Sequence, residues 1–471
     1  MNALYRAFQK LIKEELRKEM PERWRPAFHV APPVGWLNDP NGLCQKDGIY
    51  HAFFQMAPFE PQGGLKFWGH SVSQDLIHWE FKGVPMLPDQ PYDCHGAYSG
   101  SALVEGDQMS LFYTGNVKNL GDYNYVTNGR ESNTILAVSK DGEKIESKKL
   151  LMTNADYPDD VTCHVRDPKV WKEGGRYYMV QGARTKEDKG VVLVFSSEDK
   201  YHWNYIHRLE SEEKFGFMWE CPDLYELDGQ TILCISPQGV EQDGYWYANK
   251  YQTVTSVIHG DFRTDGVPEG FRELDGGFDF YAPQTTLLPD GRRVMIAWMK
   301  SWDSCVIKEK QRWQGMMTLP RELEYRDGKI WQKPVREIEN YRKNRCCYEN
   351  VKVGESLSLE GVRGRMIDLT VELQNADGIM DGSRNSGNPN QEALDVYNEF
   401  RIELARNEEY TTVFTYDRKR QILEIDRTWS GVQRDVVCTR KLQITDDRQN
   451  LKLRFILDRS SIELFINDGS K

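Results

Sequence analysis

Five segments of the chain share one pattern: a short strand, a glycine-containing turn, and then a strongly apolar or aromatic strand. The turn glycines are Gly48, Gly106, Gly175, Gly229 and Gly291, which are 58, 69, 54 and 62 residues apart. Such turns favour β-hairpins. A period of this size predicts a repeat architecture, and each interval is long enough for one four-stranded sheet.

Five repeats of this kind predict an all-β fold with a five-bladed β-propeller, because radial repetition leaves only short, protected sheet edges. Outer strands are expected between the hairpins, at Trp68–Ser73, Thr134–Ser139 and Val191–Ser196. The segments Asp75–Trp79 and Asp199–Trp203 are near copies of one corner, which supports repetition of one unit. The alternative is an array of β-sandwiches, but the regularity of the hairpins favours the propeller.

The pattern changes after Leu323, and we expect four segments: an N-terminal helical extension (1–24), the propeller (25–333), a linker helix (334–349) and a C-terminal β-sandwich (350–471). The extension has apolar residues at helical spacing before a proline, and the last segment has alternating strands.

Within the predicted sandwich, residues 378–390 are rich in Gly, Ser and Asn and are expected to form a long loop. The neighbouring pairs Asp426-Arg427 and Asp458-Arg459 are expected on the surface. Residues 465–469 read as a strand that enters a hairpin, with the return strand missing from the sequence.

Charge and composition exclude several classes of partner. The net charge is −11, which argues against nucleic acid because phosphate binding needs a basic surface, although a local basic pocket stays open. No apolar run approaches the roughly 20 residues that span a membrane. The nine cysteines are an odd number without metal-type spacing, so we expect reduced thiols and a cytoplasmic protein. The charged residues of the N-terminal helix rule against a signal peptide.

Three acidic residues stand at matched places in the repeats. Asp39, Asp167 and Glu220 lie eight or nine residues before the turn glycines of the first, third and fourth repeats. The second and fifth repeats carry Tyr98-Ser99 and Tyr281–Gln284 at similar places. If the strand that carries these residues is the innermost one of each blade, all these side chains converge on one end of the propeller axis.

Crowded carboxylates have a chemical use. Like charges in one site raise one pKa, so that one carboxyl group stays protonated near neutral pH. One ionised and one protonated carboxyl group are the equipment for glycoside hydrolysis. The alternative is a Mg²⁺ or Ca²⁺ site, but Arg166 beside Asp167 would neutralise the cluster without an ion. We therefore predict no metal and no cofactor.

The motifs Trp36–Gly42 (Trp-Leu-Asn-Asp-Pro-Asn-Gly), Arg166–Pro168 and Trp219–Pro222 resemble, in this order, the signature of the invertase-type glycoside hydrolases of family 32, the β-fructofuranosidases. The resemblance implies a propeller followed by a sandwich, and a retaining double displacement. It implies that Asp39 is the nucleophile that attacks C2 of a fructosyl unit. Glu220 would be the general acid and then the base. Asp167 would hold fructosyl hydroxyls and stabilise the transition state.

The resemblance also implies residues of the sugar pocket. Asn38 lies beside the nucleophile, and Gln55 and Tyr98-Ser99 match the aromatic-aromatic-Gln and aromatic-Ser-Gly steps of the family. The remaining predicted pocket residues are Arg166, Trp68 and Trp298. For Trp298 the alternative is a buried core residue.

One segment departs from many family members. The sequence Gly64-Leu-Lys-Phe-Trp68, together with residues 93–100 and 277–284, is similar to the bacterial sucrose-6-phosphate hydrolases. A lysine at the rim, Lys66, would meet a 6-phosphate as a point charge, with His95 assisting. The alternative for Lys66 is a solvated loop lysine.

We therefore predict a cytoplasmic β-fructofuranosidase that acts on sucrose 6-phosphate and on sucrose. The alternatives are an invertase or short-fructan exohydrolase without phosphate preference, and a fructan-binding propeller without catalysis. The expected partner is a small sugar, with no nucleic acid and no membrane. The sequence leaves the oligomeric state open, a homodimer being one option.

Overall fold

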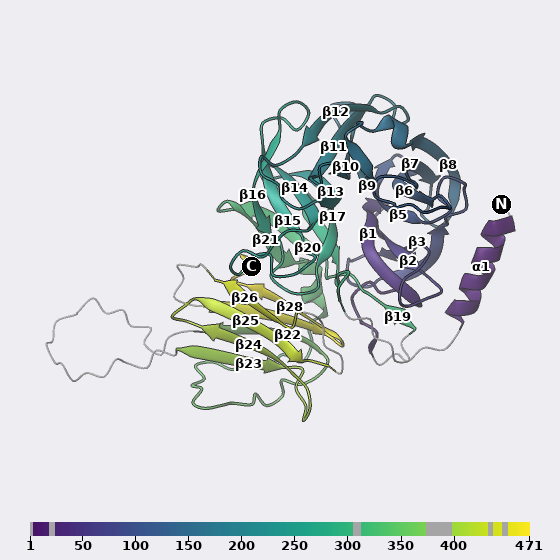
Figure 1. Ribbon diagram of the computed structural model, residues 1–471. Coiled ribbons are helices and arrows are strands. Elements are labelled where there is room, and N and C mark those ends of the chain that lie inside the picture. Colours follow the sequence, from purple (N-terminus) through teal and green to yellow (C-terminus); the bar gives the residue numbers. More distant parts are fainter. Residues whose placement is uncertain (1–2, 18–23, 305–311, 374–397, 432–436, 445–450) are drawn as a thin grey trace.

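The computed structural model describes residues 3–17, 24–304, 312–373, 398–431, 437–444 and 451–471. These residues form a propeller with a sandwich packed at its side, and a helix at the N-terminus (Figure 1). The predicted five-bladed propeller followed by a β-sandwich is confirmed. The loop predicted at 378–390 lies outside the described residues.

Each blade is an antiparallel sheet of four strands that follow one another along the chain, and one further strand joins the first blade. Blade one has β1 (Gly35–Lys46), β2 (Ile49–Ala57), β3 (Phe67–Ser73), β4 (Glu80–Met86) and the added β19 (Trp313–Gln314). Blade two has β5 (Ala97–Glu105), β6 (Gln108–Lys118), β7 (Arg130–Ser139) and β8 (Ile145–Met152). Blade three has β9 (Val161–Glu173), β10 (Arg176–Thr185), β11 (Gly190–Ser197) and β12 (Asn204–Leu209). Blade four has β13 (Met218–Leu227), β14 (Gln230–Gln238), β15 (Val254–His259) and β16 (Val267–Glu273). Blade five has β17 (Tyr281–Leu287), β18 (Arg293–Trp298), β20 (Arg321–Arg326) and β21 (Lys329–Pro334).

The first strand of every blade lies innermost. Strands β1, β5, β9, β13 and β17 contact one another in ring order, and the contact between β17 and β1 completes the ring (Figure 1). The two-residue strand β19 comes from blade five and pairs in parallel with β1, matching Gly35 with Trp313. This pairing ties the last blade to the first.

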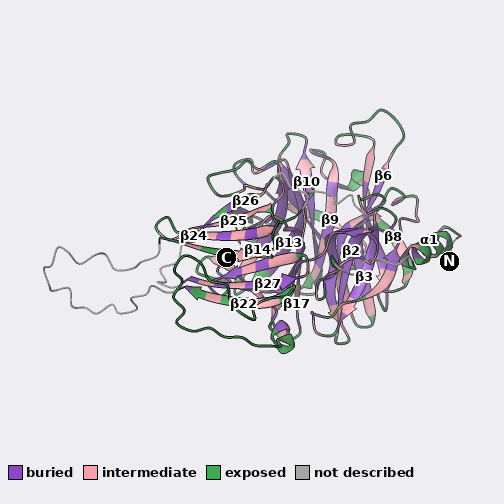
Figure 2. Cartoon of the chain, turned by 90° about the horizontal axis from the view of Figure 1, so that it is seen from below, coloured by how far each residue is buried: buried purple, intermediate pink, exposed green. Residues whose placement is uncertain are grey.

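The predicted hairpin turns account for the start of each blade. Gly48, Gly106, Gly175, Gly229 and Gly291 all have a positive φ, which a residue without Cβ adopts at little cost. Apolar side chains of the strands fill the space between neighbouring blades, and buried residues run through both the inner strands and the strands paired with them (Figure 2). The inner strands are therefore held rigidly, and side chains at their ends have fixed positions.

The N-terminal helix α1 (Ala3–Leu16) lies against blade one. Ile12 is buried, and the ring of Phe8 packs edge-on against Phe67 with centroids 5.1 Å apart. The side chain of Gln9 donates to the carbonyl oxygen of Val84 at 2.9 Å. The amphipathic helix expected from the sequence thus covers the outside of the propeller.

The C-terminal part is a sandwich of two antiparallel sheets. One sheet has β22 (Met366–Leu373), β27 (Leu451–Asp458) and β28 (Ser461–Ile466). The other has β23 (Glu399–Leu404), β24 (Thr411–Asp417), β25 (Ile422–Trp429) and β26 (Thr439–Gln443). The sheets share an apolar core in which Phe414 and Phe455 pack edge-to-face with ring centroids 4.9 Å apart.

Two short 3-10 helices complete the described elements, η2 (Asn154–Asp156) and η3 (Arg336–Tyr341). The helix η3 lies within the linker predicted at 334–349, and the chain after it is irregular up to β22. Residues 342–350 lack the spacing of apolar residues that lets a longer helix pack. The boundaries of the four predicted segments remain predictions.

The prediction that Asp458 forms a surface pair with Arg459 is wrong. Asp458 is fully buried between the sandwich and the start of the propeller, where Nδ1 of His29 contacts its Oδ2 at 2.7 Å. Its oxygens also accept hydrogen bonds from the backbone N–H groups of Ala27 and Phe28. Asp458 lies at the end of β27, next to a turn. Its buried partners come from a distant segment of the chain, so no local sequence pattern indicates that it is buried.

The eight cysteines among the described residues are all free thiols. No described helix is long and apolar enough to cross a membrane.

Candidate active site

The three predicted acidic residues come together at one end of the inner strands. Asp39 on β1, Asp167 on β9 and Glu220 on β13 are only 6%, 6% and 9% exposed. Cys221, next to Glu220, connects the other two. Its backbone N–H donates to Oδ2 of Asp167 at 2.9 Å, and its Sγ lies 3.7 Å from Oδ2 of Asp39. Three blades thus contribute one carboxyl group each to a single buried cluster.

A break in strand pairing positions these side chains. Register shifts occur between Leu37 and Pro40 in β1, between Glu220 and Asp223 in β13, and beside Asp167 in β9. The same irregularity occurs in β5 and β17. A bulge bends a strand and redirects its side chains, so each inner strand turns its functional residue toward the propeller axis.

Three residues at these bulges have a backbone conformation that is rare outside glycine. Asp167, Cys221 and Ala282 have φ values of 65°, 49° and 51°, and each precedes a proline. Proline lacks the N–H group that regular pairing would use, so its presence fits a bulge. Non-glycine residues held at positive φ store strain and cluster at functional sites.

Asp39 is held by one oxygen only. Its Oδ2 accepts hydrogen bonds from Oγ of Ser99 at 2.6 Å and from Nε2 of Gln55 at 3.2 Å. Its Oδ1 is buried, and no described residue forms a hydrogen bond with it. The side chain of Asn38 accepts from Nε1 of Trp36 at 3.1 Å. The predicted pocket residues Asn38, Gln55 and Ser99 therefore surround Asp39, and one carboxylate oxygen is left for another partner.

Glu220 is held through both oxygens. Nη2 of Arg166 donates to Oε1 at 2.6 Å, and the hydroxyl of Tyr281 donates to Oε2 at 2.5 Å. Arg166 is farther from its sequence neighbour Asp167, with 3.9 Å between Nε and Oδ2. Blades three and five thus fix the orientation of a carboxyl group that blade four supplies.

Burial and mutual repulsion raise the pKa values of two of the acids. Burial raises the pKa of Asp167 to about 7, with Glu220 and Asp39 adding to the effect and Arg166 opposing it. Burial also raises the pKa of Asp39, which the hydrogen bond from Ser99 opposes. The sequence predicted a raised pKa for one carboxyl group of the crowded site, whereas the pKa is raised in two of them, Asp167 and Asp39.

An aromatic cluster borders the site. Trp298 is fully buried and packs edge-to-face against Trp36, with ring centroids 5.7 Å apart, and against Trp302 at 5.1 Å. Trp68 is also fully buried, and its Nε1 donates to the carbonyl oxygen of Tyr98. In the described structure both predicted pocket tryptophans are thus buried, and each contacts a neighbouring aromatic residue.

Lys66 lies beside this cluster. Its Nζ is 5.5 Å from the ring centre of Trp36 and 5.8 Å from that of Trp302. Burial lowers the pKa of Lys66 to about 8, and the negative charge of Asp39 opposes the change. Lys66 is therefore partly enclosed rather than fully solvated, and its charge acts on the predicted nucleophile.

No sequence pattern predicted a functional role for Tyr281, Cys221, Trp36 or Trp302. The first three lie within motifs that were already marked, so proximity to a marked residue was the available signal. Trp302 lies just after β18 and had no such signal. Among the described residues, no group of three or more His, Cys, Asp or Glu side chains could hold a metal ion.

Comparisons with known proteins cover nearly the whole chain. The family model described as "Glycosyl hydrolases family 32 N-terminal domain" matches residues 29–334, and "Glycosyl hydrolases family 32 C terminal" matches residues 337–471. The chain is 35% identical to the sucrose-6-phosphate hydrolase of Bacillus subtilis (strain 168), covering 99% of this chain and 91% of that protein. It is 37% identical to the raffinose invertase of Escherichia coli, covering 97% and 90%. The structure of sucrose-6-phosphate hydrolase from Lactobacillus gasseri is similar, with a TM-score of 0.83 and 28% identity, over 98% of this chain and 89% of that one.

Proposed function

Because the chain belongs to glycosyl hydrolase family 32, we propose that it is a β-fructofuranosidase that hydrolyses the fructosyl bond of sucrose 6-phosphate, and also that of sucrose. The proposed reaction is a retaining double displacement, in which one carboxyl group attacks the sugar and a second one transfers the protons. We further propose that the enzyme acts in the cytoplasm, where sugars imported by phosphorylation arrive as phosphates.

Asp39 and Glu220 divide the chemistry of this proposal. Asp39 attacks C2 of the fructosyl unit while Glu220 gives its proton to the departing glucosyl oxygen. Water then attacks C2, Glu220 takes a proton from that water, and the bond between C2 and Asp39 breaks. Carboxyl groups that work in this way are typically about 5–5.5 Å apart.

The observation that carries the proposal is the asymmetric environment of Asp39. Ser99 and Gln55 fix one oxygen, while the buried Oδ1 has no partner among the described residues. A buried, oriented and incompletely bonded carboxylate oxygen suits a nucleophile. Asp167, held by Cys221, is proposed to bind fructosyl hydroxyls and stabilise the oxocarbenium-like transition state.

The binding-module alternative predicts a different outcome for one variant. Asp39→Ala removes the proposed nucleophile, so turnover should fall by at least on the order of 10⁴-fold while sugar affinity stays within a few-fold. The measurements are kcat for sucrose and calorimetric binding of sucrose to the variant. Turnover at the wild-type level would remove Asp39 from its proposed role.

The substrate part of the proposal is supported by the relatives, two of which are sucrose-6-phosphate hydrolases. The test is kcat/KM for sucrose 6-phosphate against sucrose, at one pH and one salt concentration. A preference of tenfold or more for the phosphorylated sugar, about 1.4 kcal/mol, supports it. Equal values would leave an invertase or short-fructan exohydrolase without phosphate preference.

A further inference from the structure

Two cations stand directly opposite each other on neighbouring strands of blade two. In the antiparallel pairing of β6 with β7, Lys118 is the partner of Arg130. Like charges at such positions destabilise a sheet. In the described part of the chain neither side chain forms an ion pair with Asp or Glu, although the sequence has 72 acidic residues. Nζ of Lys118 lies 5.3 Å from the ring centre of Tyr125, and the pair is a positive charge without a carboxylate partner among the described residues, at the end of β6 and the start of β7.

The guanidinium of Arg130 is incompletely bonded. Its Nη1 donates to Nε2 of His164 on blade three at 2.9 Å, whereas its Nε is buried and has no hydrogen-bond partner among the described residues. Two neighbouring arginines differ: Arg166 pairs with Glu220, and Arg184 pairs with Asp188 at 2.6 Å. An arginine that lacks a carboxylate partner and keeps a buried free donor is suited to an anionic ligand.

The pKa of His164 also shows the effect of the positive charges around it. Burial, followed by the charges of Arg166 and Arg130, lowers the pKa of His164 to about 3. The ring is therefore neutral, and its Nε2 lies 2.9 Å from Nη1 of Arg130 and 3.2 Å from the carbonyl oxygen of Tyr125. Burial and the charge of Arg130 likewise lower the pKa of Lys118. A bound anion would relieve this repulsion.

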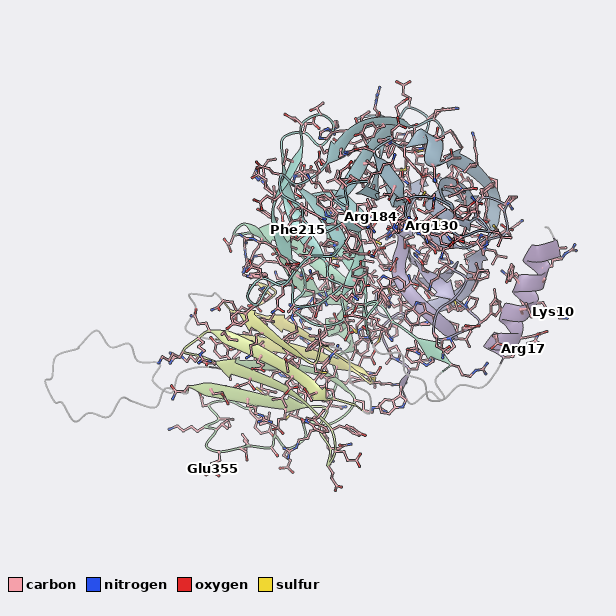
Figure 3. The ribbon with its side chains drawn as sticks, viewed as in Figure 1. Lys10, Arg17, Arg130, Arg184, Phe215 and Glu355 are labelled. Atoms are coloured by element: carbon pink, nitrogen blue, oxygen red, sulfur yellow. The ribbon has the colours of Figure 1, made fainter. Side chains whose placement is uncertain are left out.

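The cluster borders the proposed sugar pocket. The charge of Arg166, in the active site, acts on both Arg130 and His164. The backbone N–H of Lys118 donates to Nδ1 of His95, in the loop that leads into β5. Figure 3 labels Arg130 and Arg184 near the middle of the propeller in that view. The positive charge thus lies on the pocket side of blades two and three.

We propose that Lys118 and Arg130, with His95 and His164 beside them, bind the 6-phosphate of the substrate. The inference rests on the proposed function, because it needs a phosphorylated sugar in the pocket. Lys66, by contrast, has its Nζ beside the rings of Trp36 and Trp302, and its charge acts on Asp39, so it is not the main phosphate contact. Arginine suits the task because its planar donors match phosphate oxygens.

The test compares substrate preference in four variants, Arg130→Gln, Arg130→Lys, Lys66→Gln and Arg184→Gln. Arg130→Gln should lower kcat/KM for sucrose 6-phosphate about 10- to 100-fold more than kcat/KM for sucrose. Arg130→Lys should recover part of the preference. Arg184→Gln is the matched control, since it removes the same charge from a neighbouring arginine that already has a carboxylate partner, and it should leave the preference unchanged.

The outcomes separate the inference from the function on which it rests. A wild-type enzyme without preference overturns the phosphate part of the proposed function, and the inference with it. A wild-type preference that persists in Arg130→Gln, or is lost only in Lys66→Gln, overturns the inference alone. Because an arginine variant can also perturb folding, thermal unfolding and inhibition by glucose 6-phosphate are measured alongside. Inhibition that weakens in Arg130→Gln at unchanged Tm supports the site, and unchanged inhibition counts against it.

Discussion

At the scale of single residues, the hydroxyl of Tyr281 is a positioning group. It is fully buried and donates to Oε2 of Glu220, while Arg166 holds the other oxygen. Tyr281→Phe removes one of these two restraints. We expect kcat for sucrose to fall about tenfold or more with KM changed by less than about threefold, as for an interaction that matters mainly in the transition state.

The matched control is Tyr225→Phe. Tyr225 lies on the same strand as Glu220, is also buried, and has a hydroxyl with no hydrogen-bond partner in the described part of the chain. Its loss should leave kcat and KM near the wild-type values. Equal effects in the two variants would show that the Tyr281 hydroxyl acts only through packing.

Asp167 makes the protein less stable than it could be. Burial, with Glu220 and Asp39, raises the pKa of Asp167 from 3.8 to about 7, so the folded state binds its proton more tightly than the unfolded state. A raised carboxyl pKa destabilises the folded state progressively as pH rises from about 4 to 7. Asp167→Asn should therefore increase the free energy of unfolding at pH 8, by about 4 kcal/mol at most, and change it little at pH 4.

Urea unfolding of both proteins at the two pH values measures this difference. Asp160→Asn is the control of opposite sign, because the pairing of Asp160 with Arg208 lowers its pKa. That variant should be less stable than the wild type at pH 8. If Asp167→Asn were also less stable at pH 8, the ionised carboxylate would be a stabilising group.

The sequence was sufficient to predict which acids meet, but not how they are bonded. Matched spacing before the turns placed Asp39, Asp167 and Glu220 on inner strands, and a propeller brings such strands together. Arg166 was expected to bind a sugar hydroxyl or Asp167, whereas it donates to Glu220. The choice between two nearby carboxylates depends on side-chain rotamer and strand twist, which the spacing of residues does not encode.

At the scale of elements, a buried ion pair joins the inner strands below the carboxylates. Nζ of Lys169 on β9 lies 3.1 Å from Oδ1 of Asp223 on β13 and donates to the carbonyl oxygen of Thr285 on β17 at 2.7 Å. Lys169 thus connects blades three, four and five near the axis. Lys169→Met leaves the almost fully buried Asp223 without its counter-charge, which typically costs about 3–5 kcal/mol.

Denaturant unfolding at pH 7 tests this cost. Lys172→Met is the control, since Lys172 is on the same strand but pairs with Glu105 at the surface. A surface pair contributes little, so the control should unfold close to the wild type. If the two variants had similar free energies of unfolding, Lys169 would not have this structural role.

Some features of the strands and turns could be predicted from the sequence, and others could not. Glycine turns and apolar alternation are local signals, and they predicted the hairpins and the five blades. The positive φ of Cys221 and Ala282 could not be predicted, because only neighbouring blades hold these residues in that conformation. For example, the backbone N–H of Ala282 donates to Oγ of Ser236 on the next blade at 3.0 Å.

At the scale of the whole molecule, buried charges join the propeller to the sandwich. Glu463 on β28 accepts hydrogen bonds from Nη2 of Arg321 on blade five and from the backbone N–H of Leu319. Arg321 in turn donates to Asp275 at 2.7 Å. The two parts were predictable separately, but this contact unites residues more than 100 positions apart, and no local pattern marks it.

His29 makes this junction dependent on pH. Its Nδ1 contacts Asp458 at 2.7 Å and its Nε2 contacts Glu463 at 3.0 Å. Burial alone lowers the pKa of His29, but the two carboxylates outweigh it and raise the pKa to about 9. Because the folded pKa lies above the usual 6.5, the stabilisation is complete below about pH 6.5 and is lost as pH rises through 9.

His29→Gln should therefore lose about 3 kcal/mol of stability at pH 6 and progressively less as pH increases. The glutamine keeps a hydrogen-bonding side chain but carries no charge, so it leaves Asp458 and Glu463 without a positive charge between them. Unfolding free energies at pH 6, 8 and 10 test the prediction. A difference between variant and wild type that stays constant from pH 6 to pH 10 would mean that His29 acts through its shape, and that its charge does not hold the two domains together.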